Sequence, residues 1–276
     1  MRPIDEQVVL VTGTTGGLGR ALAERLAALG ATVVMHGRHG GRLERACEQI
    51  RAAVPGAVLH PAVADLSCLA EVNGLADRVL AERPALHALV NNAGVGFGSD
   101  SSRRETSTDG IELRLAVNHV AGALLIRRLL PLLQASAPSR IVQVASLGQA
   151  PIDLADPQLE RGYDGWQAYA QSKLAQVMLT RDLAGELDPE TVTINALHPA
   201  TFMDTGMVCE GGIAPQSSVG EGLEATLRLL ADPGLDGVSG RFFDGTREAR
   251  PHHTADDPAA RARVRELTDD LLRRAA

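Results

Sequence analysis

The sequence predicts an α/β protein, a single-domain Rossmann-type doubly wound fold whose seven-stranded parallel sheet is flanked by helices. Short apolar runs alternate with longer stretches of helical period along the chain. This alternation is typical of a parallel sheet built by right-handed crossovers. The runs are apolar at nearly every position, as strands buried on both faces are. The first run also leads directly into a glycine-rich turn.

Seven β-branched or apolar runs are the expected strands, at residues 8–11, 32–35, 57–63, 86–90, 140–144, 192–197 and 240–243. Six stretches rich in Ala, Leu, Arg and Glu are the expected helices, at residues 20–29, 41–53, 66–81, 110–133, 168–187 and 220–230. Two long segments, 148–165 and 202–219, read as irregular, and loops of that length in a compact domain are often functional. A charged helical pattern begins at Pro258.

No internal repeat and no linker divides the 276 residues, so we expect one domain. Its dinucleotide-binding part spans about residues 1–146, its catalytic and substrate-binding part about 147–245, and its C-terminal tail and helix 246–276. The net charge of -7 disfavours nucleic acid as a partner. The three cysteines and eight histidines show no metal-ligand spacing, so we expect no metal.

Residues 113–133 form the longest apolar stretch, but it contains Arg114, Arg127 and Arg128. A membrane span needs about 20 mostly apolar residues with few or no charges, so we expect no membrane span and no membrane association. The first strand-like run begins at Val8, which leaves little room for a signal peptide or anchor. We therefore expect a cytoplasmic protein.

The glycine-rich turn covers residues 12–19, between the first expected strand and the first expected helix. Glycines allow the backbone to approach a pyrophosphate, and helix N–H groups then point at its oxygens. Glycines also mark tight strand–helix turns that bind nothing, but the position at the first βα junction favours a cofactor. The residues expected to contact it are Gly13, Thr15, Gly17, Leu18 and Gly19.

The second run is followed by His36-Gly37-Arg38, without an acidic residue. In NAD sites a carboxylate near this position binds the ribose 2′-OH. A guanidinium suits a 2′-phosphate instead, through charge-assisted hydrogen bonds. We therefore expect NADP(H) rather than NAD(H), with Arg38 on the phosphate and His39 and Arg42 as further candidates. The alternative is an ordinary surface arginine.

Segments spread over nearly the whole chain resemble the short-chain dehydrogenase/reductase family in order and spacing. They are residues 12–19, Asp65-Leu66, Asn91-Asn92-Ala93-Gly94, Asn118, Ser146, Tyr169-Ala-Gln-Ser-Lys173 and His198-Pro199. Each segment alone is a weak signal, whereas the ordered set is specific. Residues 109–113, 117–119, 138–142, 146–147 and 239–243 look most like the retinol dehydrogenase and WW-domain-oxidoreductase branch.

Tyr169 and Lys173 are four residues apart, so on a helix they share one face. A free phenol, with a pKa of about 10, is a poor base near neutral pH. A neighbouring ammonium stabilises the phenolate, so we expect Lys173 to lower the pKa of Tyr169. The pair therefore predicts proton transfer at a carbonyl or alcohol oxygen.

The family resemblance assigns Asn118, Ser146, Tyr169 and Lys173 to catalysis. It implies that Ser146 binds the substrate oxygen, that Lys173 also holds the nicotinamide ribose, and that Asn118 binds a relay water. Further cofactor contacts are implied for Asp65, Leu66, Asn92, Ala93, Gly94, Pro199 and Thr201. The chain departs from the family at residue 200, where alanine replaces the usual glycine and puts the local backbone conformation in question.

The expected activity is the NADP(H)-dependent interconversion of a carbonyl and a primary or secondary alcohol. A catalytically idle NADP(H) sensor is one alternative, but both Tyr169 and Lys173 are present. An epimerase or dehydratase is another, but its usual C-terminal domain would need a longer chain. We expect an apolar small-molecule substrate and a homodimer formed through helices 113–133 and 168–187. The expected pocket wall is Leu147, Ile152, Leu154, Leu159, Tyr163, Trp166, Phe202, Met203 and Met207.

Overall fold

A computed structural model describes residues 2–274 and contains one twisted sheet in strand order β3-β2-β1-β4-β5-β6-β7-β8. The strands are β1 (Val8–Val11), β2 (Thr32–Gly37), β3 (Leu59–Val63), β4 (Ala88–Asn91), β5 (Ser139–Val144), β6 (Val192–His198), β7 (Phe242–Asp244) and β8 (Arg247–Ala249). The first seven pair in parallel, as predicted, and their order is that of a doubly wound fold. The α/β Rossmann-type fold is therefore confirmed.

The prediction of seven strands was wrong by one, because β8 pairs antiparallel with β7 at the sheet edge. A two-residue turn of Gly245 and Thr246 joins them, and Gly245 takes a positive φ of 56°. Such turns favour glycine. The strand itself is only three residues long and largely exposed, so it lacks the apolar run that indicates a buried strand.

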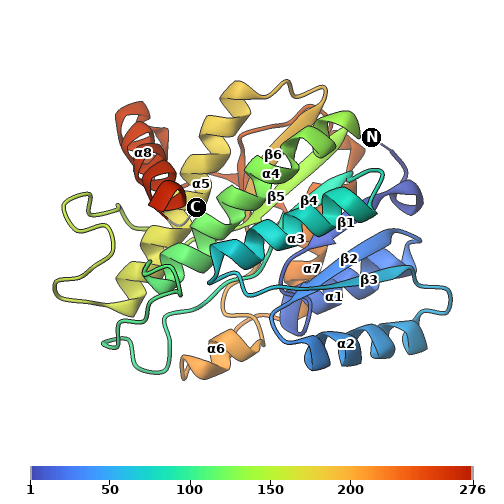
Figure 1. Ribbon diagram of the computed structural model, residues 1–276, viewed down its shortest axis with the longest axis horizontal. Helices are drawn as coiled ribbons and strands as arrows, with labels where there is room; N and C mark the ends of the chain where they lie inside the picture. The colour runs from blue at the N-terminus through green and yellow to red at the C-terminus, as the bar shows by residue number, and fades with distance from the viewer. Residues whose placement is uncertain (1, 275–276) are drawn as a thin grey trace.

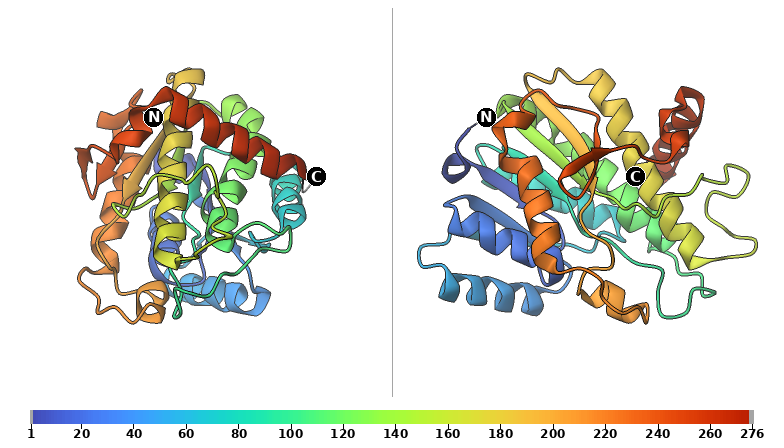
Figure 2. Two further views of the ribbon diagram at one scale, coloured as in Figure 1. Left: turned by 90° about the vertical axis from the view of Figure 1, so that its left-hand side faces the viewer. Right: turned by 180° about the vertical axis from the view of Figure 1, so that it is seen from behind.

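The sheet is buried on both faces, and β1 shows how alternate residues serve the two layers. Leu10 packs with α3 (Leu69–Glu82) and α4 (Ala121–Ala135), whereas Val9 and Val11 pack with α1 (Gly17–Ala28) and α2 (Gly40–Ala53). Figure 1 shows α3, α4 and α5 (Gly165–Glu186) on the near face. The opposite face, with α1, α2 and α7 (Val219–Ala231), is turned toward the viewer in the right panel of Figure 2.

The helix before α4 departs from regular geometry. Residues Leu115–Val120 (η2) form a π-helix that continues directly into α4, where the sequence predicted one regular helix. π-Helical turns occur frequently at functional sites, and Asn118 lies in this one. The segment 202–219, expected to be irregular, contains the short helix α6 (Gly206–Glu210). Short 3-10 turns η1, η3 and η4 occupy Ile4–Glu6, Pro233–Leu235 and His253–Asp256.

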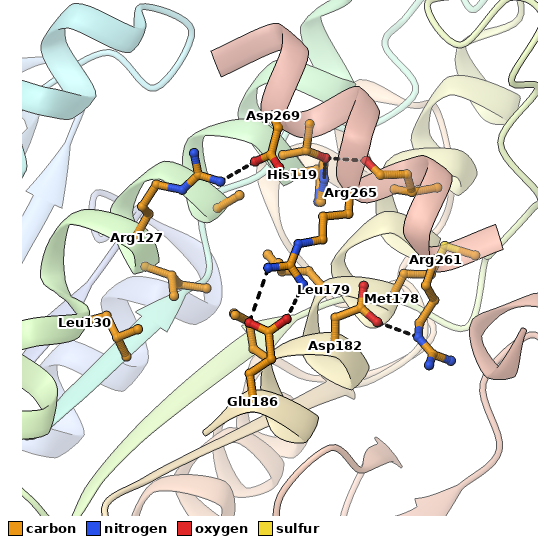
Figure 3. Close-up of a pocket in the computed structure, with 15 residues that line it drawn as sticks. His119, Arg127, Leu130, Met178, Leu179, Asp182, Glu186, Arg261, Arg265 and Asp269 are labelled. Atoms are coloured by element: carbon orange, nitrogen blue, oxygen red, sulfur yellow. Dashed lines mark hydrogen bonds and ion pairs between the residues drawn. The ribbon is translucent and has the colours of Figure 1, made fainter. Parts of the chain in front are cut away.

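The C-terminal helix α8 (Pro258–Arg274) lies across α4 and α5. Three ion pairs attach it: Arg261 to Asp182, Arg265 to Glu186, and Asp269 to Arg127, as Figure 3 shows. A cavity of about 210 Å³ lies between the three helices. This contact occupies part of the surface expected to form a homodimer, so dimerisation there stays a prediction that must accommodate α8. Residues 275–276 of the predicted tail lie outside the described residues.

Within residues 2–274, one helical segment, Leu115–Ala135, is long and apolar enough to cross a membrane by length and composition alone. Its most apolar window has a mean hydropathy of 1.3, and 67% of that window is buried inside the fold. Burial of this kind is what a core helix shows, and the membrane and location expectations stay predictions.

Candidate active site

The glycine turn between β1 and α1 is packed too closely to accept side chains at two positions. Gly13 has a φ of +74°, and a Cβ there would lie 2.9 Å from the Ala93 Cα. A Cβ on Gly19 would lie 2.2 Å from the Gly13 carbonyl oxygen. The N-cap residue, Gly16, has no side chain to cap the first helix amides. The helix N-terminus therefore presents N–H groups and a positive dipole end that suit an anion.

His36, near the end of β2, holds this turn through a hydrogen bond to Gly13, a role that sequence analysis missed. The Gly13 N–H donates to His36 Nδ1 at 3.2 Å, and His36 Nε2 lies 2.9 Å from the Ala64 carbonyl oxygen. The two bonds require the proton on Nε2 and a neutral ring. Burial lowers the pKa of His36 and keeps the ring neutral. A histidine directly after a buried strand was the available signal.

Thr12 and Asn92 attach the turn to the end of β4. The Thr12 hydroxyl accepts hydrogen bonds from the backbone N–H groups of Asn92 and Ala93, both at 2.9 Å. The Asn92 side chain donates to the Thr12 carbonyl oxygen at 2.8 Å. The predicted cofactor residues Asn92 and Ala93 are thus part of the scaffold of the glycine turn as well as of the cleft wall.

The opposite end of the cleft is lined by the residues expected near the adenosine. Arg38 is exposed at the rim. A Cβ on Gly37 would lie 2.7 Å from Thr15 Cγ2, so a side chain there would have to displace Thr15. Asp65 Oδ1 accepts from the N–H and hydroxyl of Ser67, at 2.9 and 2.8 Å. Asp65 therefore stabilises the turn before α3.

Ser146, Tyr169 and Lys173 meet at the centre of the cleft. Ser146 follows β5, and the other two share one face of α5, as predicted from their spacing. The Lys173 ammonium donates to the Val144 carbonyl oxygen at 2.9 Å and to Gln176 Oε1 at 3.0 Å. Its nitrogen lies 5.6 Å from the centre of the Tyr169 ring.

Burial dominates the electrostatics of this pair. It lowers the pKa of Lys173 to about 7. It also raises the pKa of Tyr169, against a hydrogen bond with Ser146 that acts in the opposite direction. The expectation that Lys173 lowers the pKa of Tyr169 is therefore not met in the protein alone. The physical reason is that desolvation penalises both charged forms.

Asn118 is the one predicted catalytic residue that does not line the cleft. Its Oδ1 accepts from the Val95 N–H at 2.7 Å, and its Nδ2 donates to the Ser172 hydroxyl at 2.9 Å. Only the Gly94 backbone separates Asn118 from Lys173, because a Cβ on Gly94 would lie 3.2 Å from Asn118 Oδ1 and 3.6 Å from Lys173 Nζ. Asn118 thus joins the loop after β4 to α5, directly behind the lysine.

The glycine turn, the strand ends and the Ser146–Tyr169–Lys173 centre line one continuous cleft of about 790 Å³ at the carboxyl edge of the sheet, where doubly wound folds bind ligands. Every predicted cofactor residue lines it, together with Ser146: Gly13, Thr15, Gly17, Leu18, Gly19, Arg38, Asp65, Leu66, Asn92, Ala93, Gly94, Tyr169, Lys173, Pro199 and Thr201. Within residues 2–274, no cluster of His, Cys, Asp and Glu could hold a metal ion.

The cleft wall near Tyr169 is apolar. Of the wall residues expected from the sequence, Leu147, Trp166, Phe202, Met203 and Met207 line the cleft. The others do not, and they are Ile152, Leu154, Leu159 and Tyr163. Phe97 lines the wall and was missed, because the loop after β4 carries no pattern that predicts where its side chains point.

Ala200 fits the segment after β6 without strain. Residue 200 is absent from the non-glycine residues with a positive φ, which among residues 2–274 are Leu159 and Phe202, at 49° and 42°. The His198 Nε2 lies 3.1 Å from the Thr201 hydroxyl and fixes that side chain beside Pro199. The replacement of the usual glycine therefore leaves the backbone of this segment in an ordinary conformation.

The fold and the site together define a dinucleotide-binding α/β protein with a Ser–Tyr–Lys centre. The family model described as short chain dehydrogenase matches residues 7–212. Human retinol dehydrogenase 14 is 33% identical over 293 residues, covering 96% of this chain and 86% of that protein. The chain belongs to the short-chain dehydrogenase/reductase family of oxidoreductases, near its retinol dehydrogenase branch.

Two solved structures show the same likeness. A short chain dehydrogenase from Shigella flexneri complexed with NADP has a TM-score of 0.71 and 26% identity, covering 87% of this chain and 97% of that one. A 3-ketoacyl-(acyl-carrier-protein) reductase from Brucella melitensis complexed with NADH has a TM-score of 0.69 and 25% identity, covering 87% and 96%.

Proposed function

We propose that this protein is an NADP(H)-dependent oxidoreductase that interconverts an apolar carbonyl compound and its alcohol. The observation that carries the proposal is the convergence of Ser146, Tyr169 and Lys173 in the same cleft as the glycine turn. Protonation of a carbonyl oxygen needs a proton donor, a hydrogen-bond donor that holds the oxygen and a positive charge that stabilises the phenolate left behind. The Tyr169 phenol, the Ser146 hydroxyl and the Lys173 ammonium are such groups. The apolar wall around them favours an apolar substrate.

The residues of the cleft fit a nicotinamide dinucleotide. The turn is kept free of side chains at Gly13 and Gly19, and the uncapped N-terminus of α1 offers N–H groups to a pyrophosphate. When bound, the cofactor would supply or accept the hydride. Solved relatives contain NADP in one case and NADH in another, so cofactor choice must be argued from this chain's own residues.

Arg38 supports a preference for the phosphorylated cofactor. It is exposed at the rim of the cleft beside His39 and Arg42. No carboxylate follows β2 directly, so the 2′-phosphate would meet no like charge from that strand end. A planar guanidinium binds a phosphate through paired hydrogen bonds.

In reduction, Tyr169 would donate its phenolic proton to the substrate oxygen while Ser146 holds that oxygen by a hydrogen bond. The high pKa of the buried phenol keeps the proton on Tyr169 until the oxygen becomes strongly basic. Two of the three Lys173 donors are used by Val144 and Gln176, which leaves the third N–H for a ligand in the cleft that Lys173 lines. Lys173 would then stabilise the phenolate that remains.

Replacement of Tyr169 by Phe tests this assignment. The variant removes the proton donor and should lower kcat by about 10²–10⁴-fold, the usual contribution of general acid–base catalysis. NADPH affinity, measured by calorimetry, should stay within about twofold, because the glycine turn is untouched. Retinaldehyde and a set of simpler aldehydes serve as substrates. Unchanged kcat in the variant would refute the mechanism, and NADPH binding without any carbonyl turnover by the wild-type chain would favour the sensor alternative.

A further inference from the structure

A buried ion pair lies close to the cleft but outside the catalytic set. Glu112 is 2% exposed and Arg114 is 1% exposed, and the carboxylate oxygen lies 3.4 Å from the guanidinium nitrogen. Taking both charges out of water costs about as much as their attraction returns, so a buried pair is weak evidence for stability. The presence of such a pair is better explained by the chain segments that it holds in one arrangement.

Glu112 connects two segments of the chain through its own atoms. Its Oε1 accepts a hydrogen bond from the Tyr163 hydroxyl at 2.9 Å, and its Oε2 accepts from the Leu115 N–H at 2.7 Å. Its backbone N–H donates to Gln158 Oε1 at 3.0 Å. The carboxylate thus joins the long loop before α5 to the start of the π-helix that carries Asn118.

Arg114 holds the loop after β4. Its Nε donates to the Gly96 carbonyl oxygen at 2.9 Å, and its guanidinium lies 5.8 Å from the centre of the Tyr163 ring. Gly98 has a φ of +81°, and a Cβ there would lie 2.9 Å from Arg114 Nη2. The backbone on both sides of Phe97 is therefore packed directly against the arginine.

Phe97, whose flanking backbone packs against Arg114, lines the cleft. Its ring stacks on Trp166 with centres 3.5 Å apart and planes within 10°, and meets Tyr169 edge-on at 6.2 Å. A Cβ on Gly211 would lie 2.0 Å from Phe97 Cε2, so the ring is also confined from the α6 side. Phe97 is 6% exposed, whereas Trp166 is 44% exposed and open to the cleft.

We propose that Glu112 and Arg114 are positioning residues that fix the stacked pair of Phe97 and Trp166 as a flat apolar wall beside Tyr169. This wall selects substrates that carry a planar, conjugated or aromatic group next to the carbonyl over compact aliphatic ones. The selectivity rests on the function proposed above, whereas the positioning of the stack does not. The two are therefore tested by separate measurements.

The test uses Arg114→Lys, which keeps the positive charge near Glu112 and loses the Nε bond to Gly96. The matched control is Arg140→Lys. Arg140 is 4% exposed and donates to the Leu229 and Asp232 carbonyl oxygens, each at 2.9 Å, and it does not line the cleft. Both variants disturb a buried arginine, but only one disturbs the stack.

Trp166 is the only tryptophan in the chain, so its fluorescence reports the stack directly. Arg114→Lys should shift the Trp166 emission to longer wavelength and increase its quenching by acrylamide, whereas Arg140→Lys should leave both as in the wild type. Unchanged emission and quenching in a folded Arg114→Lys protein would overturn the proposal. If that variant does not fold, Tyr163→Phe removes only the hydroxyl bond to Glu112 and should produce a smaller shift in the same direction, and the absence of any shift would again overturn it.

Kinetics test the selectivity. Arg114→Lys should raise KM for cinnamaldehyde by up to about tenfold, the scale of one lost aromatic contact, and change kcat and the KM for butanal by less than about twofold. An equal rise in KM for both aldehydes would refute the selectivity of the wall. If the wild-type chain reduces no aldehyde, the proposed function fails, while the fluorescence measurement still decides the positioning of the stack.

Discussion

The buried imidazole of His119 should make the packing of α8 sensitive to acid. His119 is 3% exposed, and its Nε2 lies 2.8 Å from the Thr268 hydroxyl on α8. That hydroxyl donates its own proton to the Val264 carbonyl oxygen at 2.8 Å, so it accepts the hydrogen from His119. The other ring nitrogen, Nδ1, is buried without a hydrogen-bond partner, so a second proton there would be unpaired, and burial lowers the pKa of His119 from 6.5 to about 4.

The size of the effect follows from this difference. Because the folded pKa lies below the unfolded one, the unfolded chain binds the proton more readily. The stability that depends on neutral His119 is complete above pH 6.5 and is lost as the pH falls toward 4. At about 1.4 kcal/mol for each pH unit, the loss at pH 4.5 is about 2.5 kcal/mol.

Urea unfolding at pH 7.5 and 4.5 measures this loss for the wild type, His119→Gln and His39→Gln. Glutamine retains a donor for Thr268 without titrating, so His119→Gln should lose about 2.5 kcal/mol less than the wild type over this interval. His39 is exposed, and His39→Gln should follow the wild type. Equal losses in all three proteins would show that His119 does not control the acid sensitivity.

Three further predictions concern the cofactor. Gly19→Ala should abolish NADPH binding and lower Tm, because the added Cβ would lie 2.2 Å from the Gly13 carbonyl oxygen. Gly16→Ala should weaken NADPH binding and leave Tm unchanged, because a Cβ at Gly16 has no protein atom within 4 Å. A normal NADPH affinity in Gly16→Ala would place the pyrophosphate elsewhere. Arg38→Ala should weaken NADPH by about 1.5–3 kcal/mol and leave NADH nearly unchanged, and calorimetry showing equal losses would contradict the phosphate contact. Bound NADPH should quench Trp166 emission by energy transfer more than NADP+ does, and equal quenching would argue against a nicotinamide near Trp166.

The fold was predictable because its signals are local. Most parallel strands contain a short apolar run, and the residues of β1 alternate between the two helix layers as strand geometry requires. The misses have local causes as well. β8 contains a single small apolar residue, Ala249, and no apolar run, and the π-helical turn at 115–120 carries the same apolar period as the α-helix that follows it.

The site was predictable where one motif carries the contacts. The glycine turn, Ser146 and the Tyr169–Lys173 pair are each close in sequence to the element that positions them. Phe97 and the Glu112–Arg114 pair depend instead on contacts between separate loops, such as the bond from the Tyr163 hydroxyl to Glu112, 51 residues away. No spacing rule reports a contact of this kind.

The protonation states of Tyr169 and Lys173 are the clearest property that the spacing of residues in the sequence does not predict. The interval of four residues predicted that Lys173 and Tyr169 meet, and they do. The net shift of the Tyr169 pKa depends on desolvation as well: burial raises the pKa of this phenol and lowers the pKa of Lys173 to about 7, because both charged forms lose hydration. A motif thus identifies which groups can exchange a proton, whereas the burial imposed by the whole sheet determines where that proton resides.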